Sequence, residues 1–324
     1  MRKIEQIRSL LKQGQVVGFP TETVYGLAVN ALDQSAVSTV FELKGRPAFN
    51  PLIVHIRNKE EIDRYCQDVN PIVYQLAEHY WPGPLTLILK SNGTIPSIVT
   101  GGQNTIGLRV PAHPLALELL YSIDFPLAVP SANPYHKVSA TLPEHIAEYF
   151  GPDFPVLNGG ACRIGIESTV LSLVEHQAEI LRHGSITEEQ IKKDFPGLSF
   201  INDTQEIFAE NSNMIHYAPK TPIYLNDPAQ VLDGNLKLHH RIAYLNFTNE
   251  EEAMSEQFTE FLFDDSENLE EIARGFYQTL FKIDQNDFDA IFCRTFPETG
   301  IGIALNDKLR KAAVKCPSTE TALS

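Results

Sequence analysis

Apolar positions along the first two-thirds of the chain follow two different periods, one typical of helices and one typical of strands. Apolar residues recur at helical spacing in the segments 4–11, 34–46, 59–66, 71–81, 114–123 and 142–150. Short runs of apolar and β-branched residues lie between these helices, at 15–20, 51–56, 85–90, 105–111, 126–131, 154–159 and 168–175. Strands that alternate with helices predict an α/β fold in which helices pack on a sheet.

The periodicity is lost over residues 198–222, which contain several Asn and Ser and end in HYAPKTP, a composition typical of a linker. Further strands are predicted at 222–226, 241–247 and 289–296, and further helices at 267–283 and 303–313. We therefore expect one α/β domain at 1–197, a linker at 198–222 and a smaller α/β domain with a parallel sheet at 223–324. Gly300-Ile301-Gly302 before the last helix is a poor match to a phosphate-binding loop.

Composition agrees with two folded domains. The chain has 324 residues, of which 43% are hydrophobic and 21% charged, so extensive disorder is excluded. The net charge is −15: residues 1–200 carry 16 Lys and Arg against 20 Asp and Glu, and residues 201–324 carry 10 against 21. This balance argues against wrapping nucleic acid by neutralising its phosphates.

The N-terminal segment and the cysteines indicate a cytoplasmic protein. Charges interrupt the apolar positions of residues 1–15, so the segment predicts an amphipathic helix instead of a signal peptide, and no run reaches the ~20 apolar residues of a membrane span. The four cysteines are far apart in sequence and form no C-x-x-C pair. We interpret them as isolated thiols of a reducing compartment.

Familiar catalytic signatures such as G-x-x-x-x-G-K-[ST], G-x-S-x-G and H-E-x-x-H are absent from the sequence. Cations and hydroxyls instead cluster at the ends of predicted strands and helices, where α/β folds place their ligands. These candidates are Lys44, Arg46, His55, Arg109, Ser131, Asn133, Ser139, Ser168, Thr169 and Arg182.

Most of these positions have two interpretations. Lys44 and Arg46, separated by a glycine, suit a phosphate ligand, but cations also decorate helix C-termini because of the helix dipole. Ser131 and Asn133 after an apolar strand are either ligand contacts or ordinary turn residues. A lone strand histidine such as His55 is more often a core residue than a ligand.

Two arginines favour an anionic ligand. Arg109 lies inside a predicted strand between Leu108 and Val110, so if it is buried it must find a carboxylate or an anionic ligand. Arg182, within EILRHG, is a similar case. We expect the ligand to be small and held by a few converging cations.

Long segments of the chain resemble one known family in the expected order. They are FPTETVYGLAVNA, KGRPAFNPLIVHI, WPGPLTLIL, NTIGLRVPAHPLA, PSAN, GIESTV and ILRHG, followed by HYAPKTP and the closing GIGIALNDKLRKAA. The sequence is similar to the YrdC-like (TsaC-type) family of threonylcarbamoyl-AMP synthases in its long, two-domain form. The resemblance implies a twisted YrdC-like sheet around a cationic cavity in a catalytic domain at 1–197, followed by a Rossmann-like C-terminal domain.

The same resemblance implies a nucleotidyltransferase reaction. L-threonine, bicarbonate and ATP give L-threonylcarbamoyladenylate and pyrophosphate, for threonylcarbamoyl-adenosine modification of tRNA by downstream threonylcarbamoyltransferase components. Magnesium is expected with the nucleotide, bound through phosphates and water, without a dedicated site of protein ligands. Neither a membrane partner nor direct tRNA binding is expected.

Site residues implied by the resemblance fall into two groups. Threonine contacts are expected from Thr23, His55, Arg109, the backbone at Val129 and Ser168. ATP contacts are expected from Lys44, Arg46, Asn50, Thr105, Ser131, Asn133, Ser139, Arg182 and, in a linker that acts as a lid, Tyr217. Lys44 and Arg46 are expected to stabilise the transferring phosphate and are the predicted catalytic residues.

The sequence departs from the family pattern at two places. Residues 134–137 read Pro-Tyr-His-Lys where a small pair is common, and Asn211–Ile215 replace a usual Pro-Gly-Met. Two other functions stay open at this point: a paralogue that handles a different carbamoyl-adenylate, and an RNA-binding module with a cationic concave surface. The mild charge of residues 1–200 and the lack of interleaved basic and aromatic residues weigh against RNA.

Overall fold

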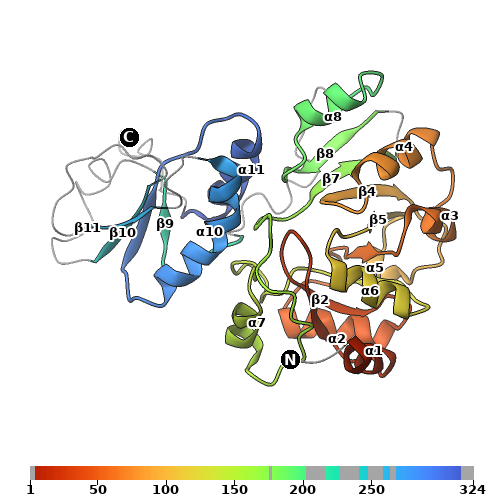
Figure 1. The fold of residues 1–324 in the computed structure, drawn as a ribbon, viewed down its shortest axis with the longest axis horizontal. Helices are drawn as coiled ribbons and strands as arrows, with labels where there is room; N and C mark the ends of the chain where they lie inside the picture. Colours follow the sequence, from red (N-terminus) through yellow and green to blue (C-terminus); the bar gives the residue numbers. More distant parts are fainter. Residues whose placement is uncertain are drawn as a thin grey trace, which may run out of the picture. The chain divides into compact units, whose positions relative to one another are not determined.

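The computed structural model describes residues 4–174, 177–201, 216–225, 241–246, 258–262 and 268–314. The chain divides into two compact units, one made of residues 1–135 and 139–210 and the other of residues 136–138 and 211–324. Each unit contains one sheet (Figure 1). The α/β architecture expected from the alternation of periods is confirmed in both.

The first unit has an eight-stranded mixed sheet of order β1-β2-β6-β3-β5-β4-β7-β8. Its strands are β1 (Val17–Phe19), β2 (Gly26–Asn30), β3 (Ile53–His55), β4 (Leu85–Lys90), β5 (Thr105–Arg109), β6 (Leu127–Ala128), β7 (Thr169–Ser172) and β8 (Glu179–Arg182). Parallel pairing joins β3 to β5 and β4 to β7, and the other neighbours are antiparallel.

Helices of this unit follow the predicted segments closely. They are α1 (Ile4–Lys12), α2 (Gln34–Lys44), the 3-10 turn η1 (Lys59–Glu61), α3 (Ile62–Tyr65), α4 (Pro71–Tyr80), α5 (Ser97–Thr100), α6 (Pro114–Ser122), α7 (Pro143–Phe150) and α8 (Glu188–Asp194). α2 is capped at its N-terminus by Asp33, whose side chain accepts from the amides of Ser35 and Ala36. Gly45, in the left-handed region (φ 63°), caps its C-terminus.

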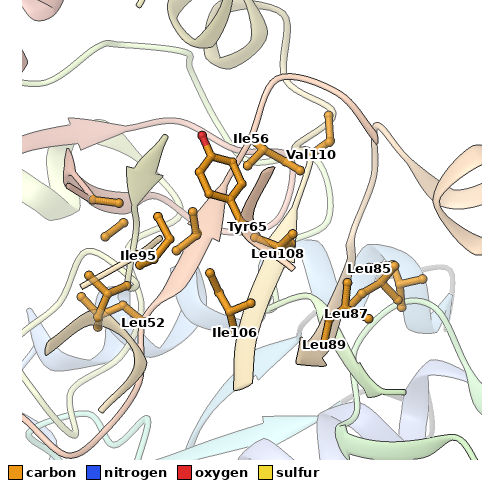
Figure 2. Packing of buried hydrophobic residues seen from close by; sticks show 14 of the residues in the cluster. Leu52, Ile56, Tyr65, Leu85, Leu87, Leu89, Ile95, Ile106, Leu108 and Val110 are labelled. Carbon is orange, nitrogen blue, oxygen red and sulfur yellow. The ribbon is translucent and has the colours of Figure 1, made fainter. Parts of the chain in front are cut away.

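The two faces of this sheet carry different cores. Leu85, Leu87 and Leu89 of β4 pack with Ile106 and Leu108 of β5 in a large apolar cluster (Figure 2) that also includes residues of α2 and α4. Residues of α1 and α6 pack on the opposite face, against β1, β2 and β6, in a second apolar cluster. Because side chains alternate along a strand, the remaining positions of β4 and β5 point away from the larger core.

The second unit has a four-stranded parallel sheet of order β11-β10-β12-β9, which confirms the parallel sheet expected there. Its elements are β9 (Ile223–Tyr224), β10 (Ile242–Asn246), β11 (Phe258–Leu262), α10 (Leu269–Asp284), β12 (Ala290–Cys293) and α11 (Ile301–Ala312). A Cβ at Gly302 would lie 2.0 Å from the carbonyl oxygen of Pro297. Close packing therefore accounts for this glycine without a phosphate ligand.

The local predictions differ from the structure at several elements. The predicted strand at 154–159 is wrong, since only a single bridge joins Val156 to Gly18; Pro152 and Pro155 cannot donate to a sheet. Strands β2, β8 and β11 and helices α5 and α8 were not predicted. The segment Asn211–Ile215, where the linker departs from the family pattern, lies outside the described residues. Among the described residues, no helix has the length and apolar character needed to cross a membrane.

Candidate active site

Polar side chains form a row across five neighbouring strands, on the face of the sheet opposite the larger core. His55 on β3 is the register partner of Arg109 on β5, and the register of β4 with β5 places Thr86 beside Arg109. Ser168, directly before β7, lies with its Oγ 2.9 Å from Thr86 Oγ1. Arg182 on β8 donates to Ser168 Oγ at 2.9 Å and to its carbonyl oxygen at 2.9 Å. The sheet thus brings four predicted site residues into one row.

Arg109 is buried, with 4% of its surface exposed. Its Nη2 donates to Glu22 Oε1 at 2.6 Å and to Thr23 Oγ1 at 3.0 Å, and its Nε donates to the carbonyl oxygen of Gly83 at 3.2 Å. The other carboxylate oxygen of Glu22 accepts from the amide of Ala112 at 2.9 Å. The carboxylate that a buried Arg109 requires is therefore Glu22.

His55 is a buried imidazole without a hydrogen-bond partner for either nitrogen among the described residues. Burial, followed by the nearby Arg109, lowers the pKa of His55 well below its ordinary value, so the ring is neutral. The ring of Phe19 contacts it edge-on, with centroids 5.9 Å apart. Buried polar atoms normally have partners, so these nitrogens suit a ligand. The amide of Val129 donates to Ile53, so only the Val129 carbonyl remains for a ligand contact.

Lys44 ends α2 with a buried ammonium group held by backbone oxygens. Its Nζ donates to the carbonyl oxygen of Ser131 at 2.6 Å and to that of Asn133, and it lies 3.5 Å from Asn133 Oδ1. Burial, followed by Arg46, lowers the pKa of Lys44 well below its ordinary value, while Glu167 acts in the opposite direction. These contacts bring three predicted ATP residues, Lys44, Ser131 and Asn133, close together.

Arg46 and Asn50 meet at Tyr135, one of the residues that depart from the family pattern. Asn50 Nδ2 donates to the Tyr135 hydroxyl at 3.0 Å, and the guanidinium carbon of Arg46 lies 5.8 Å from the Tyr135 ring centroid. Arg46 also donates to the carbonyl oxygens of Asn50 (3.3 Å) and Pro51 (3.0 Å). The backbone amide of Tyr135 donates to the carbonyl oxygen of Lys44 at 2.7 Å, which ties this group to the end of α2.

The remaining predicted residues have different surroundings. Ser139 is fully buried and donates to Glu167 Oε1 at 2.6 Å. Thr105 starts β5 on the same face as Arg109 but roughly 13 Å further along the strand, and its hydroxyl donates to Gln103. Tyr217 is a member of the second unit.

Tyr217 has a left-handed backbone (φ 60°), uncommon for a bulky residue. It is nevertheless buried, with its ring 6.2 Å from that of Tyr277 on α10 and 5.8 Å from Lys308 Nζ on α11. His216, the preceding residue, donates its amide to the carbonyl oxygen of Lys311. Side-chain packing and hydrogen bonding within the second unit thus hold the described end of the linker.

Glu22, Glu167 and Thr86 belong to these clusters but were not among the predicted site residues. Both carboxylates lie within quoted family segments, FPTETVYG and GIESTV. A signal for Glu22 was present, because a buried strand arginine requires an acidic partner. Nothing in the local pattern marked Thr86, whose contact with Ser168 depends on the pairing of β4 with β7.

Comparison with known families identifies the class to which this fold and site belong. The Sua5–YciO–YrdC family model, described as "Telomere recombination", matches residues 9–184. A second model, described as "Threonylcarbamoyl-AMP synthase, C-terminal domain", matches residues 186–314. The chain therefore belongs to the Sua5–YciO–YrdC family, in the form that carries the C-terminal domain.

Named relatives narrow the class further. The chain is 35% identical to threonylcarbamoyl-AMP synthase of Pyrococcus abyssi, over 96% of this chain and 94% of the relative. It is 36% identical to threonylcarbamoyl-AMP synthase of Bacillus subtilis, over 96% and 93% of the two chains. A crystal structure of P. abyssi Sua5 complexed with L-threonine superposes with a TM-score of 0.82 and 33% identity, covering 96% of this chain and 94% of the other.

Proposed function

We propose that the protein is a threonylcarbamoyl-AMP synthase, which makes L-threonylcarbamoyladenylate from L-threonine, bicarbonate and ATP and releases pyrophosphate. Relatives of that name match it over nearly its whole length. The observation that carries the proposal is a set of three cations held in place within the first unit. Lys44 donates to the carbonyl oxygen of Ser131, Arg109 to the buried hydroxyl of Thr23, and Arg182 to the buried hydroxyl of Ser168. Such a group of cations suits two small anions, an amino acid and a polyphosphate.

The threonine subsite is proposed at Arg109. Its guanidinium pairs with the carboxylate of the amino acid. The Thr23 hydroxyl accepts from Arg109, and the Ser168 hydroxyl lies further along the polar row, next to Thr86. The neutral imidazole of His55 offers one donor and one acceptor to the ligand without competing for its carboxylate. The Val129 carbonyl is the fifth proposed contact.

The nucleotide subsite is proposed at the end of α2. Lys44 acts as a point charge, whereas the planar guanidinium groups of Arg46 and Arg182 are suited to two phosphate oxygens at once. The proposed hydrogen-bonding contacts to ATP are Asn50, Thr105, Ser131, Asn133, Ser139 and, from the linker, Tyr217.

The proposed chemistry needs no nucleophilic side chain. The ammonium group of threonine first releases a proton, and the resulting amine combines with bicarbonate to form a carbamate with loss of water. A carbamate oxygen then attacks the α-phosphorus of ATP. The new oxygen–phosphorus bond replaces the bond to the β-phosphate bridge, so pyrophosphate leaves with both electrons of that bond. This is nucleotidyl transfer, in which the protein supplies position and charge stabilisation. Lys44 and Arg46 are the proposed catalytic residues.

Magnesium is proposed to come with the nucleotide; it would supply positive charge beside the phosphates. Mg²⁺ usually binds through phosphate oxygens and water, with one or two carboxylates. Glu167 is a buried carboxylate of this donor class, which accepts from the Ser139 hydroxyl and acts on the pKa of Lys44.

The domain roles are part of the same proposal. Residues 1–197 form the catalytic domain, 198–222 a linker that closes as a lid, and 223–324 the C-terminal domain; the change of family model between residues 184 and 186 supports a boundary in that region. The adenylate is passed to threonylcarbamoyltransferase components that modify tRNA, without direct tRNA binding by this chain. ATP and tRNA are available in the cytoplasm, where we expect the protein to act.

Pyrophosphate release tests the proposed function. The full chain is incubated with ATP, magnesium and bicarbonate and with each amino acid in turn. We expect rapid release with threonine and little with the others. Absence of release with every amino acid, from protein that is folded by circular dichroism, would remove the synthase assignment.

Substitution of Arg46 tests its catalytic role. Arg46→Ala should lower kcat for pyrophosphate release by ~10²-fold or more, because a preorganised charge partner of the transition state is lost. Arg57→Ala is the matched control, since Arg57 pairs with Glu61 outside the proposed site and should leave kcat close to the wild-type value. Equal rates for the two variants would contradict the role of Arg46.

A further inference from the structure

The pairing of Glu22 with Arg109 makes this end of the threonine subsite electrically balanced. Both side chains are almost completely buried, at 2% and 5% side-chain exposure, and their charged atoms lie 2.6 Å apart. Burying an ion pair costs free energy. If the two side chains only neutralised each other, two apolar side chains of the same volume could replace them without loss of stability. The pair therefore calls for an explanation in terms of the ligand.

The hydrogen bonds of Arg109 define how a ligand reaches it. Nε and both hydrogens of Nη2 are committed, to Gly83, Glu22 and Thr23. Nη1 has two further N–H groups and no partner among the residues that the structure describes. A ligand carboxylate must therefore approach Arg109 at Nη1, on the guanidinium that Glu22 already holds.

Glu22 is itself held at both ends. One carboxylate oxygen accepts from Arg109 and the other from the amide of Ala112 at 2.9 Å, while the backbone carbonyl of Glu22 accepts from the amide of Ile164 at 2.8 Å. Each carboxylate oxygen has two acceptor sites, so both retain capacity for one more donor. Glu22 is thus a fixed negative charge with unused acceptor capacity.

Charge balance decides which ligand fits beside this pair. Glu22 and Arg109 sum to zero, so a carboxylate-only ligand would leave one uncompensated negative charge in a buried setting, and an amine-only ligand one positive charge. A zwitterion adds no net charge, and an α-amino acid carries its ammonium and carboxylate on the same carbon. Its carboxylate can face Nη1 of Arg109 while its ammonium faces Glu22.

We propose that Glu22 is a specificity-determining residue that makes the site selective for a zwitterionic amino acid over hydroxy acids and amino alcohols. The inference rests on the proposed function, because it takes threonine as the ligand and Arg109 as the contact of its carboxylate. It adds that Glu22 receives the ammonium group. Among the described residues, the ion pair with each other is the only one that Glu22 and Arg109 form.

Three ligands of matched shape test this in the unmodified protein. Calorimetric titration of the full chain compares threonine with 3-hydroxybutyrate, which lacks the ammonium, and with 1-amino-2-propanol, which lacks the carboxylate. We expect threonine to bind at least about 10-fold more tightly than either, the lower end of what a hydrogen bond to a charged group contributes. Binding of 3-hydroxybutyrate within threefold of threonine would overturn the proposal without any variant.

Glu22→Gln identifies the residue responsible. Loss of the negative charge should reduce the preference for threonine over 3-hydroxybutyrate by about 10-fold or more. It should also weaken the binding of 1-amino-2-propanol further. Glu22→Asp keeps the charge and should keep the order of affinities. The matched control is Glu61→Gln, because Glu61 also accepts from an arginine side chain and from a backbone amide, those of Arg57.

The outcomes separate this inference from the proposed function. If threonine binds and supports pyrophosphate release, but Glu22→Gln leaves the ratio of affinities as Glu61→Gln does, the inference fails and the synthase assignment stands. If threonine neither binds nor supports release, both fail. If Glu22→Gln does not fold, the affinities of the wild-type chain and of Glu22→Asp for the three ligands test the inference. Equal affinities for threonine and 3-hydroxybutyrate would again overturn it.

Discussion

Lys44 is subject to two opposing influences. Burial disfavours its charged form, while the carbonyl oxygens of Ser131 and Asn133 and the nearby Glu167 favour it. The net result is a pKa well below the ordinary value of a lysine. A polyphosphate beside the ammonium would supply negative charge and raise that pKa again.

ATP binding should therefore take up protons. Above the lowered pKa of free Lys44 and below the ordinary value of 10.5, the free protein is partly deprotonated and the complex is protonated. ATP affinity should accordingly weaken as pH rises through this range. Calorimetry in buffers of different ionisation enthalpy measures the uptake.

Lys44→Arg is the informative variant for this prediction, because arginine stays charged and the uptake should disappear. Lys192→Arg, at a lysine that pairs with Glu188 on α8, is the control and should bind protons as the wild type does. Proton uptake that persists unchanged in Lys44→Arg would show that another group titrates.

At the scale of elements, the start of α7 depends on a neutral histidine. His145 lies in the first turn, and its Nδ1 accepts from the amide of Thr141, just before the helix. Burial lowers the pKa of His145 to about 4. A protonated ring cannot accept this bond, so the beginning of α7 requires the uncharged form.

Acid should consequently destabilise the first unit through His145. The unfolded chain binds the proton with a pKa of about 6.5, so the contribution of His145 to stability is complete above that value and is lost as pH falls towards 4. The loss amounts to about 3 kcal/mol in unfolding free energy. Urea unfolding of wild type and His145→Gln at pH 7 and pH 4.5 measures it, and the pH dependence should be smaller in the variant. An identical pH dependence in both chains would contradict this role.

Elements with strong local signals were predictable from the sequence. α2 combines helical spacing with Asp33 at its start and Gly45 at its end, and β3 is a β-branched run. β2 escaped prediction because its identity as a strand depends on pairing with β1 and β6, and its Gly26 lies where a Cβ would come within 2.2 Å of Val129. Tertiary contact thus overrides local propensity there.

The site divides in the same way. Sequence identified the cations and hydroxyls, and the need of Arg109 for a counter-charge, because these follow from residue type and burial. It did not identify Glu22 as the partner, since Glu22 lies 87 residues away in sequence and meets Arg109 only through the folded sheet. The assignment of each residue to threonine or ATP stays a prediction.

At the scale of the whole molecule, each unit has its own apolar core. α2 and α4 help to build one around Leu85 and Leu108 in the first unit, and Ile242, Tyr244 and Phe292 form another in the second. Units with separate cores are expected to unfold separately.

Scanning calorimetry of the full chain should therefore show two transitions. The proposed threonine contacts lie in the first unit. At 100 times its Kd, threonine should stabilise that unit by about 2.7 kcal/mol, which raises the temperature of one transition and leaves that of the other unchanged. Serial addition of threonine measures the shift, and 3-hydroxybutyrate, which lacks the ammonium group, is the control ligand. Two transitions that move together would contradict independent unfolding.

A short segment of three residues belongs to the second unit although it lies within the sequence of the first. His136, Lys137 and Val138 are grouped with the second unit, although both neighbouring segments of chain belong to the first. Lys137 forms a parallel bridge with Ala218, and the carbonyl oxygen of His136 accepts from the amide of that residue. The backbone consequently crosses from one unit to the other three times, so no single cut in the gene separates them. A shortened protein ending at residue 197 would retain this small insert but lack Ala218, with which it pairs. Exchanging the C-terminal part between relatives therefore requires two sequence regions to match instead of one.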